Sequence, residues 1–145
     1  MTLVVDASVA IKWFVEEDLA DEAAALLHRS FSLHAPDLIV PEVMNAAWKK
    51  FVRGAIGRAQ AEAIALSLPR SPLHLTASLF LHRRALEIAI DLRHSVYDCL
   101  YLACAERVGG TVVTADRALL GKVAESSFAD LAAYLPDWAA AEGAP

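Results

Sequence analysis

A chain of 145 residues, of which 57% are hydrophobic and 21% charged, suits one compact domain and leaves little room for a second. Its net charge of −5 argues against a protein that grips nucleic acid over its whole surface. No apolar run reaches the roughly 18 residues of a membrane span. Asp6 and Lys12 interrupt the first apolar stretch, so we expect a cytoplasmic protein without a signal peptide.

Predicted strands alternate with predicted helices along the chain. Short β-branched apolar runs indicate strands, and longer segments with apolar residues three and four positions apart indicate helices. In the first half we expect strands at residues 2–5 and 31–35, and helices at residues 7–15, 18–29, 39–53 and 58–68. A loop marked by two prolines follows. In the second half we expect helices at residues 77–92 and 96–108, a strand at 111–114, a helix opening at Asp116, a weak strand at 126–129 and a short helix from Asp130.

This alternation predicts an α/β domain with a central, mainly parallel sheet and helices on both faces. We expect a single domain at residues 1–138 and a flexible tail at residues 139–145. Ligands of such sheets bind beyond the carboxyl ends of the strands, where the strand order reverses. Cys99 and Cys104 point to different sides of one helix, which predicts two buried thiols rather than a disulfide or a zinc site.

Two acids follow predicted strands. Asp6 comes directly after TLVV, and Asp116 follows TVVT after one intervening residue. Each could simply cap the helix that comes next, because aspartate is a preferred capping residue. For either residue alone the cap is the simpler interpretation, and a cap is compatible with a functional role.

Two further acids stand among apolar residues near the starts of predicted helices. Glu42 lies in LIVPEVM, where a carboxylate needs a partner or a metal, although a helix dipole also favours a glutamate in its first turn. Asp98 is the only charged residue of SVYDCLYLACA, a helix apolar on nearly all sides and therefore buried. A capping box with Ser95 would explain Asp98, but that motif favours glutamate or glutamine.

Together the four acids predict one site at one edge of the sheet. Carboxylates crowded there raise one another's pKa unless cations lie between them. An all-oxygen cluster selects Mg²⁺ or Mn²⁺, and the five histidines lack the spacing of a zinc site. Mg²⁺ held by carboxylates serves phosphoryl chemistry, and the sequence has no glycine-rich loop of the kind that binds ATP.

Four short motifs, in this order, give the sequence a resemblance to a known family. D-A-S after the first strand, P-E-V-M-N-A, S-V-Y-D-C-L-Y-L-A-C-A and T-V-V-T-A-D resemble the PIN-domain nucleases, and best of all the VapC-type ribonuclease toxins of toxin–antitoxin pairs. The resemblance extends over about residues 2–135. It implies a PIN fold, Mg²⁺- or Mn²⁺-dependent endonucleolytic cleavage of RNA, silencing by a cognate antitoxin, and a homodimer.

The resemblance also implies roles for individual residues. The metal-holding acids of the family map onto the four carboxylates, Asp6, Glu42, Asp98 and Asp116. The polar residues that support such a cluster match Ser8, Asn45 and Thr114. Some relatives carry a further acid where this chain has Leu119 and Leu120, which leaves a second metal in question.

RNA binding by an acidic protein must be local. Residues 43–61 carry no acid and four bases, whereas residues 16–22 carry five acids and no base. Any one of these bases could simply lie on a solvent-exposed face of a helix. As a set they form a candidate RNA track that leads away from Glu42, made of Lys49, Lys50, Arg53 and Arg58.

Three other functions stay open on the residues alone. A catalytically silent PIN module would act only as a binding or scaffold protein, and loss of one acid would be its mark. A haloacid-dehalogenase-like phosphatase needs D-x-D after the first strand, where this chain has Ser8. A receiver domain needs an acidic pair there and a phosphoacceptor after its third strand, and residues 7 and 36 supply neither.

Overall fold

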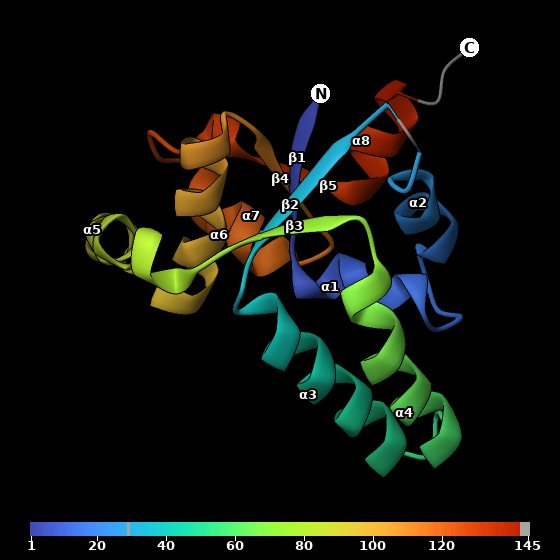
Figure 1. Ribbon diagram of the computed structural model, residues 1–145. Coiled ribbons are helices and arrows are strands. Elements are labelled where there is room, and N and C mark those ends of the chain that lie inside the picture. Colours follow the sequence, from blue (N-terminus) through green and yellow to red (C-terminus); the bar gives the residue numbers. More distant parts are fainter. Residues whose placement is uncertain (29, 143–145) are drawn as a thin grey trace.

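The computed structural model describes residues 1–28 and 30–142 (Figure 1). These residues form a five-stranded sheet of order β3-β2-β1-β4-β5, in which neighbouring strands pair in parallel. The strands are β1 (Thr2–Val5), β2 (Ser32–Pro36), β3 (Leu73–Thr76), β4 (Thr111–Thr114) and β5 (Ala132–Tyr134). The predicted α/β class with its parallel sheet is confirmed.

Helices make the connections between the strands. They are α1 (Ala7–Ala10), α2 (Ala20–Ala25), α3 (Ile39–Val52), α4 (Arg58–Ser67), α5 (His82–Leu92), α6 (Val96–Val108) and α7 (Arg117–Ala124), with α8 (Leu135–Glu142) after β5. Short 3-10 turns at Ile11–Trp13, Leu68–Arg70, Ser78–Phe80 and Ala129–Leu131 extend or join them.

The strand order reverses between β1 and β4. From β1 the chain steps outward to β2 and β3, crosses back to β4, and then steps outward to β5. Because such crossovers are right-handed, α1 to α4 cover one face of the sheet and α5 to α7 the other. Figure 1 shows α5 and α6 on one side of the strands and α2 and α8 on the other. The carboxyl ends of β1 and β4 therefore flank the crevice where such sheets bind ligands.

The central strands are buried on both faces. Leu3, Val4 and Val5 of β1, and Val112 and Val113 of β4, are at most 1% exposed. A strand covered on both faces reads as a continuous apolar run, which explains why these two strands were predicted at their observed bounds.

The helix α6 runs through the middle of one layer and packs on β1, β2 and β4. Its residues Cys99 to Ala105 are all buried, and both cysteines are free and buried, as predicted. Gly109 ends the helix with a φ of 67°, a left-handed conformation that glycine adopts at no cost. Gly110 then passes so close to β1 that a Cβ there would lie 2.7 Å from the carbonyl oxygen of Thr2.

The two edge strands differ from prediction. β3 lies directly after the proline-marked loop in a segment predicted as neither strand nor helix, and β5 lies at Ala132–Tyr134 rather than at 126–129. The helix expected from Asp130 begins at Leu135 instead. Both strands are short and only partly buried, so neither carries the apolar run that marks a central strand.

The end of the chain falls only partly within the described residues. α8 continues to Glu142, which includes the first part of the tail expected at residues 139–145, and residues 143–145 lie outside the described residues. Within the described ranges, the helices are too short or too polar to cross a membrane.

Candidate active site

Asp6 lies in a buried polar cage at the carboxyl end of β1. Its Oδ1 accepts hydrogen bonds from the backbone N–H of Val9 at 3.2 Å and from the hydroxyl of Ser8 at 2.6 Å. Its Oδ2 accepts one from the hydroxyl of Thr114 on the neighbouring strand β4. The residue is 7% exposed. Asp6 is therefore both the cap of α1 and a buried carboxylate at the point where the strand order reverses.

This environment disfavours the charge of Asp6. Burial raises the pKa of Asp6 to about 6, and the hydrogen bonds from Ser8, Thr114 and Val9 offset only part of that effect. The nearby charge of Asp116 raises the pKa further. A cation beside these two carboxylates would stabilise both charges.

Asp116 caps α7 as it stands beside Asp6. Its Oδ1 accepts from the N–H of Ala118 at 2.9 Å, and its own N–H donates to Oγ1 of Thr114 at 2.9 Å. The fully buried Thr114 thus contacts both acids. Ser8 ties the same two strand ends together, because its Oγ also accepts from the N–H of Ala115 at 3.1 Å.

Glu42 is held by a residue that the sequence analysis did not single out. The hydroxyl of Tyr101 on α6 donates to Oε1 of Glu42 at 2.6 Å, joining α6 to the first turn of α3. Burial raises the pKa of Glu42, and the charge of Asp98 raises it further, while the bond from Tyr101 works in the opposite direction. Glu42 therefore has the partner that its apolar neighbours require.

Asp98, in the first turn of α6, has a hydrogen-bond partner just before that helix. Its Oδ2 lies 2.5 Å from Nε2 of His94, four residues earlier, and the two side chains are 32% and 16% exposed. Ser95 caps α6 by accepting from the N–H of Tyr97, so the capping box with Asp98 is not what places this acid.

Tyr101 marks the centre of the cluster. Its pKa is raised by burial and then by the negative charges of Glu42, Asp6 and Asp98, so all three acids lie near its hydroxyl. One signal could have found it: Tyr101 follows Asp98 by three residues on a buried helix, and a buried tyrosine hydroxyl needs a polar partner. His94 could have been found by its spacing of four residues from the same acid.

The cluster suits a divalent ion by its donor chemistry. Among residues 1–28 and 30–142, no group of three acidic, histidine or cysteine side chains is arranged to hold a metal ion. Mg²⁺ usually keeps several waters and binds through one or two carboxylates together with substrate phosphates. The pairs Asp6–Asp116 and Glu42–Asp98 fit such a hydrated ion, because the charge of Asp116 raises the pKa of Asp6 and the charge of Asp98 raises that of Glu42.

A cleft of about 480 Å³ opens beside Glu42. One wall is the face of α3 that carries Glu42, Asn45 and Lys49, and Ser8 and Tyr97 lie across from it on α1 and α6. Asn45 thus lies next to the site, as expected from the spacing, but contacts the cleft rather than the buried cage of Asp6.

The four bases of the candidate RNA track point in different directions. Lys49 lines the cleft, whereas Lys50 binds Glu17, which also pairs with Lys12 at 3.0 Å. Arg58 begins α4, pairs with Glu62 of the same helix at 2.8 Å and lines a separate groove. Arg53 ends α3 in an exposed position. The set is therefore not one continuous basic surface.

Comparison with known proteins gives a family for this chain. The PIN domain family matches residues 3–125. Ribonuclease VapC3 of Pyrobaculum aerophilum is 33% identical over 124 residues, which cover 84% of this chain and 95% of that protein.

Solved structures share the fold. The crystal structure of PAE2754 from Pyrobaculum aerophilum superimposes with a TM-score of 0.73 at 25% identity, covering 100% of this chain and 91% of that one. VapC20 of Mycobacterium tuberculosis, described as a sarcin–ricin loop cleaving toxin, gives a TM-score of 0.61 at 16% identity over 82% of this chain and 95% of its own. VapBC2 of Rickettsia felis, solved with a DNA fragment from its promoter, gives a TM-score of 0.62 at 12% identity. The match covers 92% of this chain and 98% of that one. By sequence match, relative and fold together, this chain belongs to the PIN domain family.

Proposed function

We propose that this protein is a divalent-metal-dependent endoribonuclease that acts as the toxin of a toxin–antitoxin pair in the cytoplasm. The observation that carries the proposal is the buried pair of acids at the strand reversal. Asp6 is held by the hydroxyls of Ser8 on α1 and Thr114 on β4 in a place that raises its pKa to about 6, and Asp116 stands beside it. The 33% identity to a protein named as a ribonuclease supports the same activity.

Each acid has a part in the proposed reaction. Asp6, Glu42, Asp98 and Asp116 would share a hydrated Mg²⁺ or Mn²⁺, some of them directly and the others through its waters. The ion, when bound, supplies the positive charge that activates water and stabilises the leaving oxygen of the phosphodiester. Ser8 and Thr114 each hold one oxygen of the Asp6 carboxylate and so fix its orientation.

The side chains from α6 set the other two acids. Tyr101 holds Glu42 through one oxygen, which leaves the second oxygen available for an ion. His94 does the same for Asp98 through Oδ2. In the cleft, Lys49 would bind the RNA backbone next to the acids, where an acidic protein most needs a positive charge.

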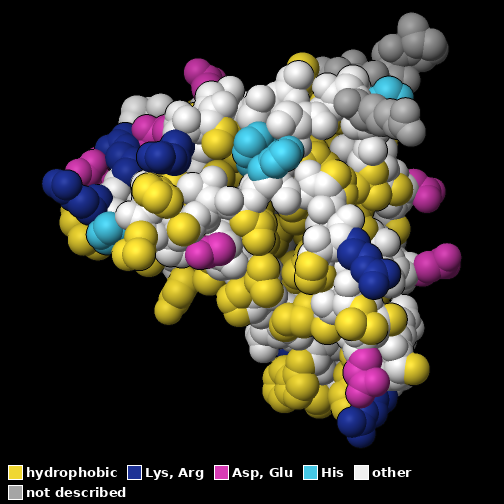
Figure 2. All heavy atoms as spheres, viewed as in Figure 1, with side chains coloured by type: hydrophobic (Ala, Val, Ile, Leu, Met, Phe, Trp, Pro, Cys, Tyr) yellow, Lys and Arg dark blue, Asp and Glu magenta, His cyan; other side chains and the backbone are white. Residues whose placement is uncertain are grey.

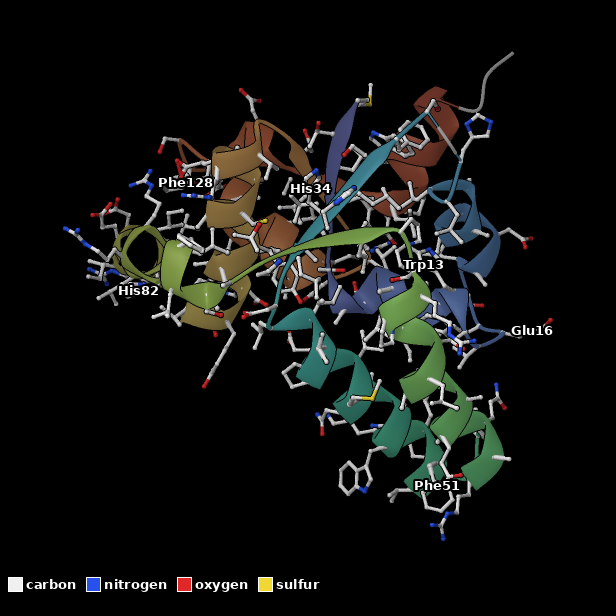
Figure 3. The ribbon with its side chains drawn as sticks, in the orientation of Figure 1. Trp13, Glu16, His34, Phe51, His82 and Phe128 are labelled. Atoms are coloured by element: carbon white, nitrogen blue, oxygen red, sulfur yellow. The ribbon has the colours of Figure 1, made fainter. Side chains whose placement is uncertain are left out.

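An antitoxin partner is supported by the apolar surface of α3 and α4. Trp48 and Val52 are 59% and 61% exposed, and Trp48 lines a groove of about 340 Å³ between these helices. Figure 2 shows hydrophobic side chains gathered over this hairpin, and Figure 3 shows Phe51 at its far end, away from the sheet. Exposed apolar patches on that scale mark protein contacts. We assign this surface to the antitoxin and expect the toxin itself to form a homodimer.

The test is direct cleavage of RNA by the purified protein. Single-stranded RNA oligonucleotides of mixed sequence, incubated with Mg²⁺, with Mn²⁺ or with EDTA, should be cut at internal positions only when a divalent ion is present. The Asp6→Asn variant serves as the matched control for contaminating nucleases. A wild-type protein that cuts no RNA with either ion, while it still binds a partner, would make the silent module the better function.

The phosphatase alternative loses support at position 8. Its chemistry needs a second acid two residues after the first, to act as acid and base. Here Ser8 fills that place, and its hydroxyl is engaged with Asp6 and with the N–H of Ala115.

A further inference from the structure

Tyr97 is an unusual residue for its place in the fold. It lies in the first turn of α6, a helix whose residues Cys99 to Ala105 are all buried, yet its own side chain is 62% exposed. It directly precedes Asp98 and lines the cleft of about 480 Å³ beside Glu42. A large aromatic ring is thus held in solvent beside the acidic cluster.

The wall of α3 in the same cleft offers polar groups in a row. Glu42, Asn45 and Lys49 are spaced by three and four residues, so they share one face of the helix, and all three line the cleft. Glu42 is the acid at one end of this row and Lys49 the base at the other. Between them lies the amide of Asn45, which both donates and accepts hydrogen bonds. This wall suits a nucleotide, whose phosphate, ribose and base present these same complementary groups.

We propose that this cleft is a subsite for one unpaired nucleotide next to the scissile phosphate, with the ring of Tyr97 stacked on its base and Lys49 bound to a phosphate of the same strand. This inference rests on the proposed function and names its substrate class. Bases within a duplex are already stacked on their neighbours, so only a single-stranded or looped nucleotide can lie on the ring.

A protein contact is the competing interpretation of the same ring. Val96 is 37% exposed, and Phe80 and Ile90, on neighbouring elements, are 64% and 67% exposed, so an apolar interface could extend to Tyr97. The cleft favours RNA because Tyr97 faces Glu42 and Lys49 there, and charged groups are depleted from the core of protein interfaces.

The test combines variants of Tyr97 with abasic substrates. Cleavage of a single-stranded oligonucleotide is measured for wild type, Tyr97→Ala, Tyr97→Phe and Tyr97→Trp. Phe80→Ala, which removes an equally exposed aromatic outside this cleft, is the matched control. We expect Tyr97→Ala to raise KM about 5- to 100-fold, the usual effect of losing one stacked base. The Phe and Trp variants should stay near wild type, because they keep a ring.

An abasic sugar placed in turn at each nucleotide around the cleavage site locates the stacked base. At one position it should weaken wild type as much as Tyr97→Ala does, and the variant should lose nothing more there. An equal loss on every substrate, or an unchanged KM, overturns the proposal. So does a Tyr97→Ala protein that fails to dimerise in sedimentation and cleaves normally.

Measurements of RNA binding test the nucleotide subsite separately from the proposed nuclease activity. The same oligonucleotides are titrated by fluorescence anisotropy against the Asp6→Asn protein with and without Tyr97→Ala. If the wild type cuts no RNA, the proposed function fails. The Kd series alone then decides the subsite: the expected weakening, absent on the one abasic substrate, supports stacking, and identical Kd values overturn it.

Discussion

The two pairs of acids in the cluster are built in different ways. Asp6 and Asp116 follow adjacent strands, so the hydrogen bonds of the sheet fix their separation. Glu42 and Asp98 stand in the first turns of α3 and α6, which cover opposite faces of that sheet and meet only at its edge. The strand pair is placed by backbone pairing, and the helix pair by how two layers pack.

Their hydrogen bonds differ in the same sense. Asp6 accepts from two hydroxyls and one backbone N–H, contributed by α1 and by the end of β4. Glu42 depends on the side chain of Tyr101, and Asp98 on that of His94. The strand pair is thus preorganised, whereas the helix pair is adjustable and relies on α6.

The largest effect should come from breaking the strand pair. Asp6→Asn should lower kcat/KM for RNA about 100- to 1000-fold, because an amide keeps the shape but loses the charge that holds the ion. Glu42→Gln and Asp98→Asn should also remove most activity, and Asp116→Asn less, since the neighbouring Leu119 and Leu120 offer no further acid.

Circular dichroism and melting curves should show that all four variants are folded. An amide variant with undiminished activity at low Mg²⁺ would remove that acid from the site.

The buried charge of Asp6 should make the metal-free protein less stable as pH rises. A folded pKa of about 6 against 3.8 in the unfolded chain means that its contribution to stability is complete below pH 3.8 and is lost as pH rises through 6. The full loss corresponds to about 3 kcal/mol at pH 7.5. Asp6→Asn has no such charge, so denaturant melts from pH 4 to 7.5 should show wild type falling relative to the variant.

Mg²⁺ binding should depend on pH through the same carboxylate. The ion needs the charged carboxylate, so it should raise the Tm of wild type more at pH 7.5 than at pH 5, and raise that of Asp6→Asn little at either pH. A Tm of wild type indifferent to millimolar Mg²⁺ and Mn²⁺ at pH 7.5 would count against a metal site of useful affinity.

Loosening the helix pair should have a smaller effect. Tyr101→Phe removes the hydroxyl that holds Glu42 and should cost about 10- to 100-fold in metal affinity or activity, the usual range for partners of metal ligands. The effect should appear mainly as a higher Mg²⁺ concentration for half-maximal activity, which a purely structural role would not change. Tyr134→Phe, whose hydroxyl contacts Arg117 instead, is the matched control and should behave as wild type.

The same contrast explains how much of the fold could be predicted from the sequence. β1 and β4 were found at their observed bounds because strands buried on both faces are continuous apolar runs. The edge strands β3 and β5 were not, because LHLT and AAY have no such run and are specified by pairing with a neighbour. Such pairing joins segments that are far apart in the chain, so a local sequence pattern does not predict it.

The candidate site was predictable where a residue's own surroundings in the sequence are unusual. The four acids stood out because each ends a strand or interrupts an apolar helix. Tyr101 and His94 did not stand out, because their only signal is their spacing from Asp98, and that spacing indicates a contact only once Asp98 is known to need a partner. The split of the basic residues was equally hidden, because the contact of Lys50 with Glu17 joins positions far apart in the chain.

We expect a smaller difference between variants of two adjacent lysines on α3. Lys49 lines the cleft with Glu42, while Lys50 is turned toward Glu17 and already paired. If Lys49 binds one RNA phosphate, Lys49→Ala should reduce the slope of log Kd against log salt by about 0.7, the share of one contact to single-stranded RNA. Lys50→Ala should leave the slope unchanged, although it carries the same formal charge change one residue away. Fluorescence anisotropy of RNA binding at several salt concentrations measures both slopes.

Arg53 lies eleven residues after Glu42, close to the same helix face as Lys49, so Arg53→Ala should reduce the slope further only if the bound strand continues along α3. Equal slopes for the two lysine variants would show that the backbone of the RNA takes another path, with the bases of α5 and its carboxyl end, Arg83, Arg84 and Arg93, as the next to vary.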